Sequence, residues 1–303
     1  MIPAIVTSLL IAWMLDYSQY RITWKNYQTR FNGYGSIPDV LKGVALAPMQ
    51  YRVFVPWSFW VLNRAIRSKP LCYEVIKILF MALGLFSMWL MLNTLWNSQL
   101  AYVGLLLTAV FYTVQFQFDY TEQYVELAIW AQFVTAVFVG DVGWMVACIV
   151  IGALTREPVV FLPVLYLFAK QDIVLFTAFC LLVVFVFFVL RMLYGWKENY
   201  LKKGVIIGKE YFSGYNHTFK NIKDIKEGLN WPLHTTWYSM LLVILSFIAI
   251  CYNSFPQSIA YCVYVVIPFV AVWFCRAMFH ETRVGLQLVV FIIPMIGRLL
   301  YAY

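Results

Sequence analysis

Long runs of apolar residues separated by short polar breaks dominate the chain. The run from Ile173 to Leu190, IVLFTAFCLLVVFVFFVL, approaches the roughly 20 apolar residues that a helix needs to cross a bilayer. Hydropathy and charge breaks predict about ten helical spans. They cover residues 2–15, 73–95, 100–117, 124–139, 142–155, 157–169, 172–193, 235–252, 257–275 and 284–302. The pattern predicts an all-α fold, a polytopic transmembrane helical bundle in which residues 1–303 form a single integral membrane domain.

Two of the connections between spans are long. Residues 16–72 are rich in Tyr, Trp and Arg, and the stretch from Val53 to Ile66 mixes apolar bulk with arginine, as an interfacial or juxtamembrane helix does. Residues 194–233 are hydrophilic and rich in lysine. Between the fifth and sixth spans, Pro158 disfavours a helical conformation at Glu157, so we expect the chain to break there.

The parity of ten spans puts the charged connections on one side of the membrane. These connections are 16–72, 118–123, 156, 194–233 and 276–283. Of the 22 Lys and Arg, all but Lys77, Lys170 and Arg298 then lie on that side. The opposite connections are short. The sequence therefore predicts a polar cavity that opens to one leaflet.

Composition supports a membrane location, with a retained first helix at the N-terminus. The chain is 63% hydrophobic and 12% charged, whereas soluble domains average about 45–50% and about 25%. With a net charge of +8, lipid headgroups or a phosphorylated substrate are expected partners rather than nucleic acid. The six cysteines lie in or beside apolar segments without a CxxC pair. GxSxG and HExxH are also absent, so serine hydrolase, zinc protease and thiol redox chemistry have no support.

An acidic stripe is predicted in VQFQFDYTEQYVELAIW. Gln115, Asp119, Glu122 and Glu126 are spaced i, i+4, i+7 and i+11, which puts them on one face if the segment is helical. Like charges at this spacing repel and need arginines or a cation to offset them. One interpretation is an ion-pair cluster that orients helices. The other is a carboxylate site, with Asp119 as a general base or with Asp119 and Glu122 as ligands of a divalent cation, Mg²⁺ or Mn²⁺.

Basic residues from separate segments suggest a phosphate or diphosphate pocket. Arg276, His280 and Arg283 share one helical face, with Glu281 turned aside, and arginine suits bidentate capture of phosphate. Snorkelling of these side chains to headgroups is the alternative. The predicted substrate-binding set is Arg52, Arg156, Glu157, Arg276, His280, Glu281 and Arg283.

Asp16 closes the first predicted span, directly before YSQYRITW. A carboxylate in that position can serve only to solvate the end of a helix. Because an aromatic and basic connection follows it, Asp16 is also a candidate catalytic base.

Four segments together resemble a known group: QYRVFVPWSF, FQFDYTEQYVELAIW, LTREPVVFLPVLYLF and HETRVGLQLVVFIIP. They are similar to the YRxxxP, Asp-containing, RE and ExR segments of a large group of prokaryotic polytopic membrane proteins. That group in turn looks similar to the C-type (GT-C) glycosyltransferases. The resemblance implies a multi-pass enzyme of a prokaryotic cell membrane that uses a polyprenyl-phosphate-linked sugar, with a divalent metal near the lipid phosphate.

The resemblance also implies roles for individual residues in an inverting transfer of the sugar to an acceptor hydroxyl. Asp16 or Asp119 would accept the proton, while Arg52, Arg156 and Arg283 would neutralise the departing lipid phosphate. Asp16 matches the family's acidic position only loosely, because Tyr17 and Ser18 follow it where the family has a second acid. Asp119 is therefore its rival for the role of base.

Two other functions remain open. The chain could be a transporter or flippase for an anionic lipid, which would need ionisable residues within the spans and a path to both sides. It could also be a non-catalytic subunit or scaffold of a larger membrane complex, with its charges collapsed into ion pairs. The side on which the charges lie is also open. The Lys and Arg bias predicts a cytoplasmic face, whereas GT-C enzymes usually act on the outer face.

Overall fold

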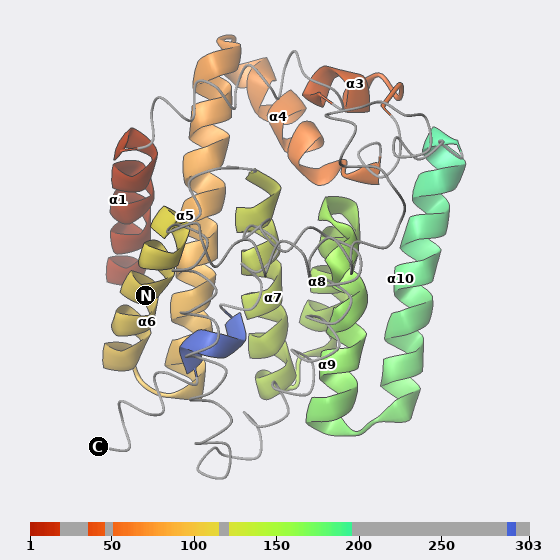
Figure 1. Ribbon diagram of the computed structural model, residues 1–303. Coiled ribbons are helices and arrows are strands. Elements are labelled where there is room, and N and C mark those ends of the chain that lie inside the picture. Colours follow the sequence, from red (N-terminus) through yellow and green to blue (C-terminus); the bar gives the residue numbers. More distant parts are fainter. Residues whose placement is uncertain (19–35, 46–50, 115–120, 196–289, 295–303) are drawn as a thin grey trace, which may run out of the picture.

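The computed structural model describes residues 1–18, 36–45, 51–114, 121–195 and 290–294. Every regular element within these ranges is helical, so the predicted all-α class is confirmed for this part of the chain (Figure 1). The spans predicted at 235–252 and 257–275 lie outside the described residues, as does most of the connection at 194–233. Of the span predicted at 284–302, residues 290–294 are described, and they are helical and buried.

Seven of the predicted spans fall wholly or mostly on described residues, and the described part of each is largely helical. The helices are α1 (Ile2–Ser18), α5 (Lys69–Leu95), α6 (Ser98–Val114), α7 (Thr121–Val139), α8 (Val142–Thr155), α9 (Phe161–Lys170) and α10 (Ile173–Tyr194). They lie side by side, and the direction of the chain alternates from each helix to the next (Figure 1). Short connections between consecutive helices favour this antiparallel arrangement.

Two of these helices are long and apolar enough to cross a membrane. α5 has 27 residues and α10 has 22. At roughly 1.5 Å per residue, both exceed the about 30 Å thickness of the hydrocarbon core. α1, α6 and α8 are apolar but shorter. Length and composition thus qualify two spans within the described residues, and the arrangement of ten spans stays a prediction.

α7 lies in the middle of the bundle and is buried on all its faces. It packs against α5 and α8, and its buried side chains include Trp130 and Phe133 (Figure 1). Glu122 and Glu126 are also buried, with 4% and 3% of their surface exposed. Because a buried carboxylate loses its hydration, the position of α7 requires polar or charged groups from neighbouring elements around these two residues.

The connection from α8 to α9 is a single 3-10 turn, η2 (Glu157–Val160). α8 ends at Thr155, and Arg156 is extended, with φ −159° and ψ 157°. The predicted break therefore exists but falls one residue before Glu157, and α9 begins at Phe161 rather than at 157. Pro158 causes the difference, because a proline without an N–H fits the first turn of a new helix.

The helix predicted from Val53 to Ile66 is found as α4 (Phe54–Ala65), and its position at a membrane interface stays a prediction. It lies across the end of the bundle at which α5 begins, next to the short α3 (Ile37–Leu41) (Figure 1). One side of α4 is buried through Val55, Pro56 and Phe59. On the other side Trp57 and Trp60 are exposed, and the Arg64 guanidinium lies 3.7 Å from the centre of the Trp60 ring. The helix is thus confirmed as amphipathic.

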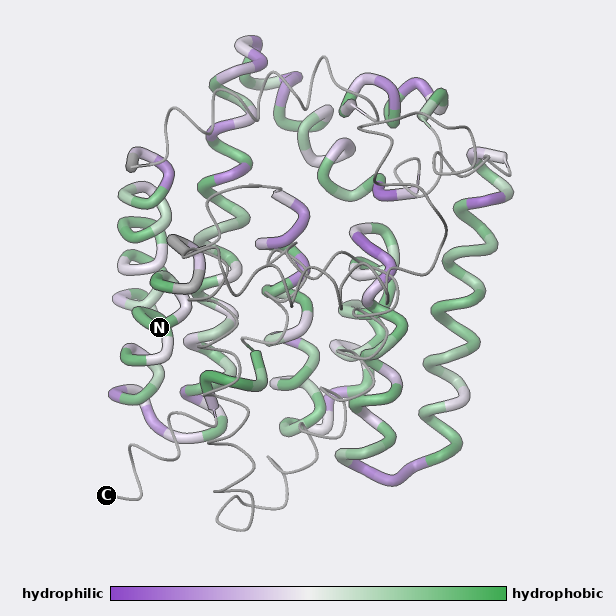
Figure 2. The backbone as a smooth tube through the Cα atoms, in the orientation of Figure 1, coloured by the Kyte–Doolittle hydropathy of each residue, from purple (hydrophilic) through white to green (hydrophobic). Residues whose placement is uncertain are grey.

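The polar segments gather at the end of the bundle that carries α3 and α4. Hydrophilic colouring concentrates there, on the first part of α5, at the start of α7, where α8 meets α9, and at the opposite turns, and the helices are otherwise mostly apolar (Figure 2). The opposite end consists of tight connections. Asp141 caps α8 by accepting a hydrogen bond from the Trp144 amide (2.9 Å), and Asp172 caps α10 by accepting one from the Val174 amide (2.9 Å). The start of α4, η2 and the end of α10 thus lie at one end of the described bundle, and the placement of all the charged connections on that side stays a prediction.

Candidate functional site

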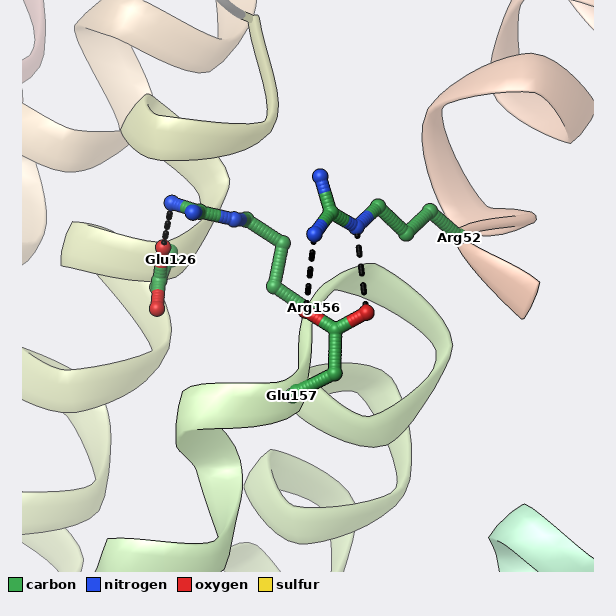
Figure 3. A network of polar contacts seen from close by, with 4 residues as sticks. All are labelled: Arg52, Glu126, Arg156 and Glu157. Carbon is green, nitrogen blue, oxygen red and sulfur yellow. Dashed lines mark hydrogen bonds and ion pairs between the residues drawn. The ribbon is translucent and has the colours of Figure 1, made fainter. Parts of the chain in front are cut away.

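The dipeptide Arg156–Glu157 points two charged side chains in opposite directions. This follows from the extended conformation of Arg156, since successive side chains of an extended chain lie on opposite sides. Figure 3 shows the result: the Arg156 side chain extends toward α7, and the Glu157 side chain faces Arg52 at the start of α4. The turn between α8 and α9 is therefore linked by ion pairs to α7 and to the start of α4.

Arg52 and Glu157 form a bidentate ion pair. Arg52 Nε donates to Glu157 Oε1 at 3.2 Å, and Arg52 Nη2 donates to Oε2 at 2.9 Å (Figure 3). The side chains are 20% and 44% exposed, respectively. The fork of the guanidinium matches two carboxylate oxygens, and it matches two phosphate oxygens equally well. In this structure Glu157 occupies that fork at a partly exposed position, and the predicted phosphate-binding role of Arg52 stays a prediction.

Arg156 and Glu126 form the second ion pair, inside the bundle. Arg156 Nη1 donates to Glu126 Oε2 at 2.6 Å (Figure 3). Their side chains are only 12% and 4% exposed. Arg156 therefore offsets the charge that α7 buries at Glu126. Removal of either partner would leave an uncompensated charge in an apolar interior.

Glu157 lies in the connection between α8 and α9, and its two arginine neighbours determine its charge state. Burial acts to raise its pKa, but the Arg52 guanidinium, through its charge and its hydrogen bond, and the charge of Arg156 act in the opposite direction. The net result is a pKa below the ordinary value of a glutamate. Glu157 is therefore an anion at neutral pH.

Tyr51 also belongs to this network, although the sequence reasoning did not assign it a role. Its hydroxyl donates to the carbonyl oxygen of Gly195 at 3.0 Å, at the end of α10. The Arg191 guanidinium, from the last turn of α10, lies 5.2 Å from the centre of the Tyr51 ring. The signal in the sequence was the position of Tyr51 directly before Arg52. Neighbouring residues thus attach the start of α4 to α10 and to η2.

Asp16 lies in a different ion pair, between α1 and α5. Its Oδ1 is 2.8 Å from Lys77 Nζ, and the Lys77 side chain is completely buried. Glu74, three residues before Lys77 on α5, interacts electrostatically with both. Asp16 is itself 6% exposed. The structure thus gives Asp16 a partner within the bundle, and its catalytic role stays a prediction.

Several predicted site residues lie outside the described part of the chain. They are Asp119, Arg276, His280, Glu281 and Arg283. Glu122, the other predicted cation ligand, is buried in the first turn of α7. Within the described ranges, no group of three or more His, Cys, Asp or Glu side chains is placed to hold a metal ion. The carboxylates of the network face guanidinium groups, and the predicted cation at Asp119 and Glu122 stays a prediction.

Of the predicted set, the structure brings together Arg52, Arg156 and Glu157, and it adds Glu126 from the acidic stripe. These residues come from parts of the chain up to 105 positions apart. Comparison with known proteins adds no identification, since no family model, no curated protein and no solved structure matches the chain.

Proposed function

We propose that the chain is a multi-pass protein of a prokaryotic cell membrane that acts as an inverting glycosyltransferase of the GT-C kind. Its donor is a sugar carried on a polyprenyl phosphate, and its acceptor is a hydroxyl group. The observation that carries the proposal is the arginine–glutamate network of Arg52, Glu126, Arg156 and Glu157 at the charged end of an apolar bundle. Arginines fixed in that way suit the phosphate of a lipid-linked substrate.

The outer surface of the bundle supports the membrane part of the proposal. On α10 the exposed side chains include Leu181 (64%) and Phe185 (62%), and on α1 they include Trp13 (57%) and Met14 (63%). Apolar surface of this extent along whole helices suits acyl chains. The amphipathic α4, with exposed tryptophans, suits the headgroup layer at the charged end.

In the proposed reaction the acceptor oxygen attacks the anomeric carbon and the bond from that carbon to the phosphate oxygen breaks. The acceptor proton passes to a carboxylate, and the electron pair of the broken bond stays on the lipid phosphate. We assign the base to Asp119, because Asp16 is enclosed and held by Lys77. A guanidinium near the departing phosphate stabilises its growing charge, which is most effective where water is scarce.

Arg52 and Arg156 contribute differently to that stabilisation. Arg52 is partly exposed and can contact the phosphate directly, whereas Arg156 is enclosed and paired with Glu126, so it contributes by holding η2, and with it Glu157, in place. Arg276, His280 and Arg283 complete the proposed phosphate site, together with Glu281. The proposal includes a Mg²⁺ or Mn²⁺ ion at Asp119 and Glu122, but no step depends on it.

Replacement of Arg52 tests the proposal with little risk to the fold. Arg52→Ala leaves Glu157, which is 44% exposed and can be rehydrated. We expect glycosyl transfer from a polyprenyl-phosphate sugar by the purified protein to fall at least about 100-fold, the scale of one lost transition-state contact. Arg64→Ala is the matched control, because Arg64 lies on the exposed side of α4 and contacts Trp60 instead. Equal transfer by both variants and the wild type would reject Arg52 as part of the site.

A non-catalytic scaffold is the second candidate, and the completeness of the pairing favours it. Glu126 and Glu157 each face an arginine, as they would if the network served only to fix α4, α7 and η2. This function predicts that the purified protein transfers no sugar. It also predicts that the protein isolated from its own membrane carries a stoichiometric membrane partner, and that Arg52→Ala releases that partner.

A further inference from the structure

The two ion pairs of the network differ in how easily they can open. Arg156 and Glu126 are 12% and 4% exposed, so separating them would leave two poorly hydrated charges. Arg52 and Glu157 are 20% and 44% exposed, so water can replace each partner. Ion pairs that water can reach contribute little net free energy. The first pair is therefore a fixed part of the bundle, and the second can exchange.

The charges of the four residues set a condition on ligand binding. Two arginines and two glutamates sum to zero, and Glu157 remains ionised at neutral pH. A phosphate that approached Arg52 with Glu157 still in place would meet a carboxylate at contact distance, and like charges repel. A phosphate held by Arg52 in the same bidentate way would use the Nε and Nη2 donors that Glu157 occupies. A phosphate bound at that edge of the guanidinium therefore competes with Glu157.

We propose that Glu157 occupies the Arg52 donors that bind phosphate, and that a phosphate ester displaces Glu157 when it binds. The inference rests on the proposed function and deepens it, since it assigns the donor's phosphate to Arg52 and makes opening of the Arg52–Glu157 pair part of substrate capture. Glu157 thus lowers the affinity of the empty site and returns to Arg52 when the phosphate leaves.

The residues on both sides of Arg52 are held in place, so the exchange of Glu157 for phosphate moves few other groups. Tyr51 is held at the end of α10 by its hydrogen bond to the Gly195 carbonyl and by the Arg191 guanidinium over its ring. On the other side, Val53 is completely buried at the start of α4. The backbone of Arg52 is thus fixed from both sides, and Arg52 keeps its place when Glu157 moves away.

Binding measurements on Glu157→Gln test the exchange. Two probes are titrated into the purified protein in detergent by calorimetry: geranylgeranyl phosphate and inorganic phosphate. The substituted amide is neutral and cannot repel the ligand, so we expect at least one probe to bind about tenfold more tightly than to wild type. The double variant Arg52→Ala/Glu157→Gln should lose that gain. Asp141→Asn, which removes one negative charge at the opposite end, is the matched control and should bind as wild type does.

The outcomes separate this inference from the proposed function. Equal or weaker phosphate binding by Glu157→Gln overturns the exchange, even if the wild type transfers sugar, and so does absence of binding in all variants. Tighter binding of geranylgeranyl phosphate without any sugar transfer by the wild type supports the exchange and rejects the transferase. A gain seen with inorganic phosphate alone supports exchange with a free phosphate and removes the lipid donor.

Discussion

Lys77 shows how a single charge can be accommodated deep in an apolar bundle. Its ammonium lies 2.8 Å from Asp16 Oδ1, and its side chain has no exposed surface. Burial of an ammonium costs several kcal/mol, and the cost is offset only by a close and well-placed partner. The pair joins α1 to α5. Asp16, which the sequence places at the end of the first span, thus pairs with a residue inside α5.

We expect Asp16→Asn to destabilise the protein by about 3–5 kcal/mol, because it removes the carboxylate that lies 2.8 Å from the buried Lys77 ammonium. The midpoint of thermal unfolding in detergent is the measurement. The double variant Asp16→Leu/Lys77→Met should recover most of the loss, since apolar side chains of similar volume replace both charges. A single variant as stable as the wild type would contradict the pairing.

Activity of the same double variant decides the role of Asp16. If Asp16 only secures α1, a stable Asp16→Leu/Lys77→Met protein should transfer sugar at a rate similar to the wild type. A stable but inactive double variant would contradict a purely structural role for the Asp16–Lys77 pair.

At the scale of the helix, the sequence was a good guide wherever apolar periodicity and charge breaks coincide. α8 has the predicted bounds, and α4 lies within one residue of its predicted ends. The connection predicted at residue 156 is also found, since Arg156 is extended. The non-helical conformation expected at Glu157 was wrong, because Glu157 begins the 3-10 turn η2 and local rules do not state which turn follows the end of a helix. The packing of η2 on α8 depends on Gly152, and no local pattern in the sequence reveals such a close approach.

Gly152→Ala tests that approach. The new Cβ would lie 2.5 Å from Val159 Cγ2 and 3.3 Å from Ile129 Cγ2, so η2 must move. We expect a loss of about 1–3 kcal/mol in stability, typical of overpacking, and reduced transfer because Glu157 and Arg156 shift. Gly143→Ala in the same helix is the control, since its Cβ meets only Asp141 Oδ1 at 3.4 Å. Similar melting temperatures for the two variants would contradict the close packing.

At the scale of the whole molecule, the sequence predicted that the charged connections share one end of the bundle. The alternating helices bring the start of α4, η2 and the end of α10 together (Figure 1). The placement of residues 194–233 beside residues 16–72 stays a prediction. What the sequence could not give is the pairing. Arg52 with Glu157 and Asp16 with Lys77 are contacts between distant segments, which depend on how helices rotate and pack. The predicted roles of Asp119 and of residues 276–283 are untested by these contacts.

Labelling of single cysteines tests the division across a membrane. In a variant without native cysteines, Asp141→Cys and Gln171→Cys occupy exposed positions at the minimal end, and Lys42→Cys is exposed beside α3 at the charged end. We expect a membrane-impermeant maleimide to label the first two from one side and Lys42→Cys from the other, in intact cells compared with inverted vesicles. Labelling of all three from the same side would contradict a membrane-spanning bundle with this topology.

The opposed side chains of Arg156 and Glu157 restrict how the chain can change in length. Links between helices usually tolerate inserted or deleted residues. Here one additional residue between the two would turn Glu157 toward the wrong side, and the carboxylate would no longer meet Arg52 while Arg156 kept Glu126. An insertion between α8 and α9 is therefore expected to be tolerated as poorly as a change in the core. Within the described residues, the tight links at Asp141 and Gln171 do not hold two ion pairs in this way.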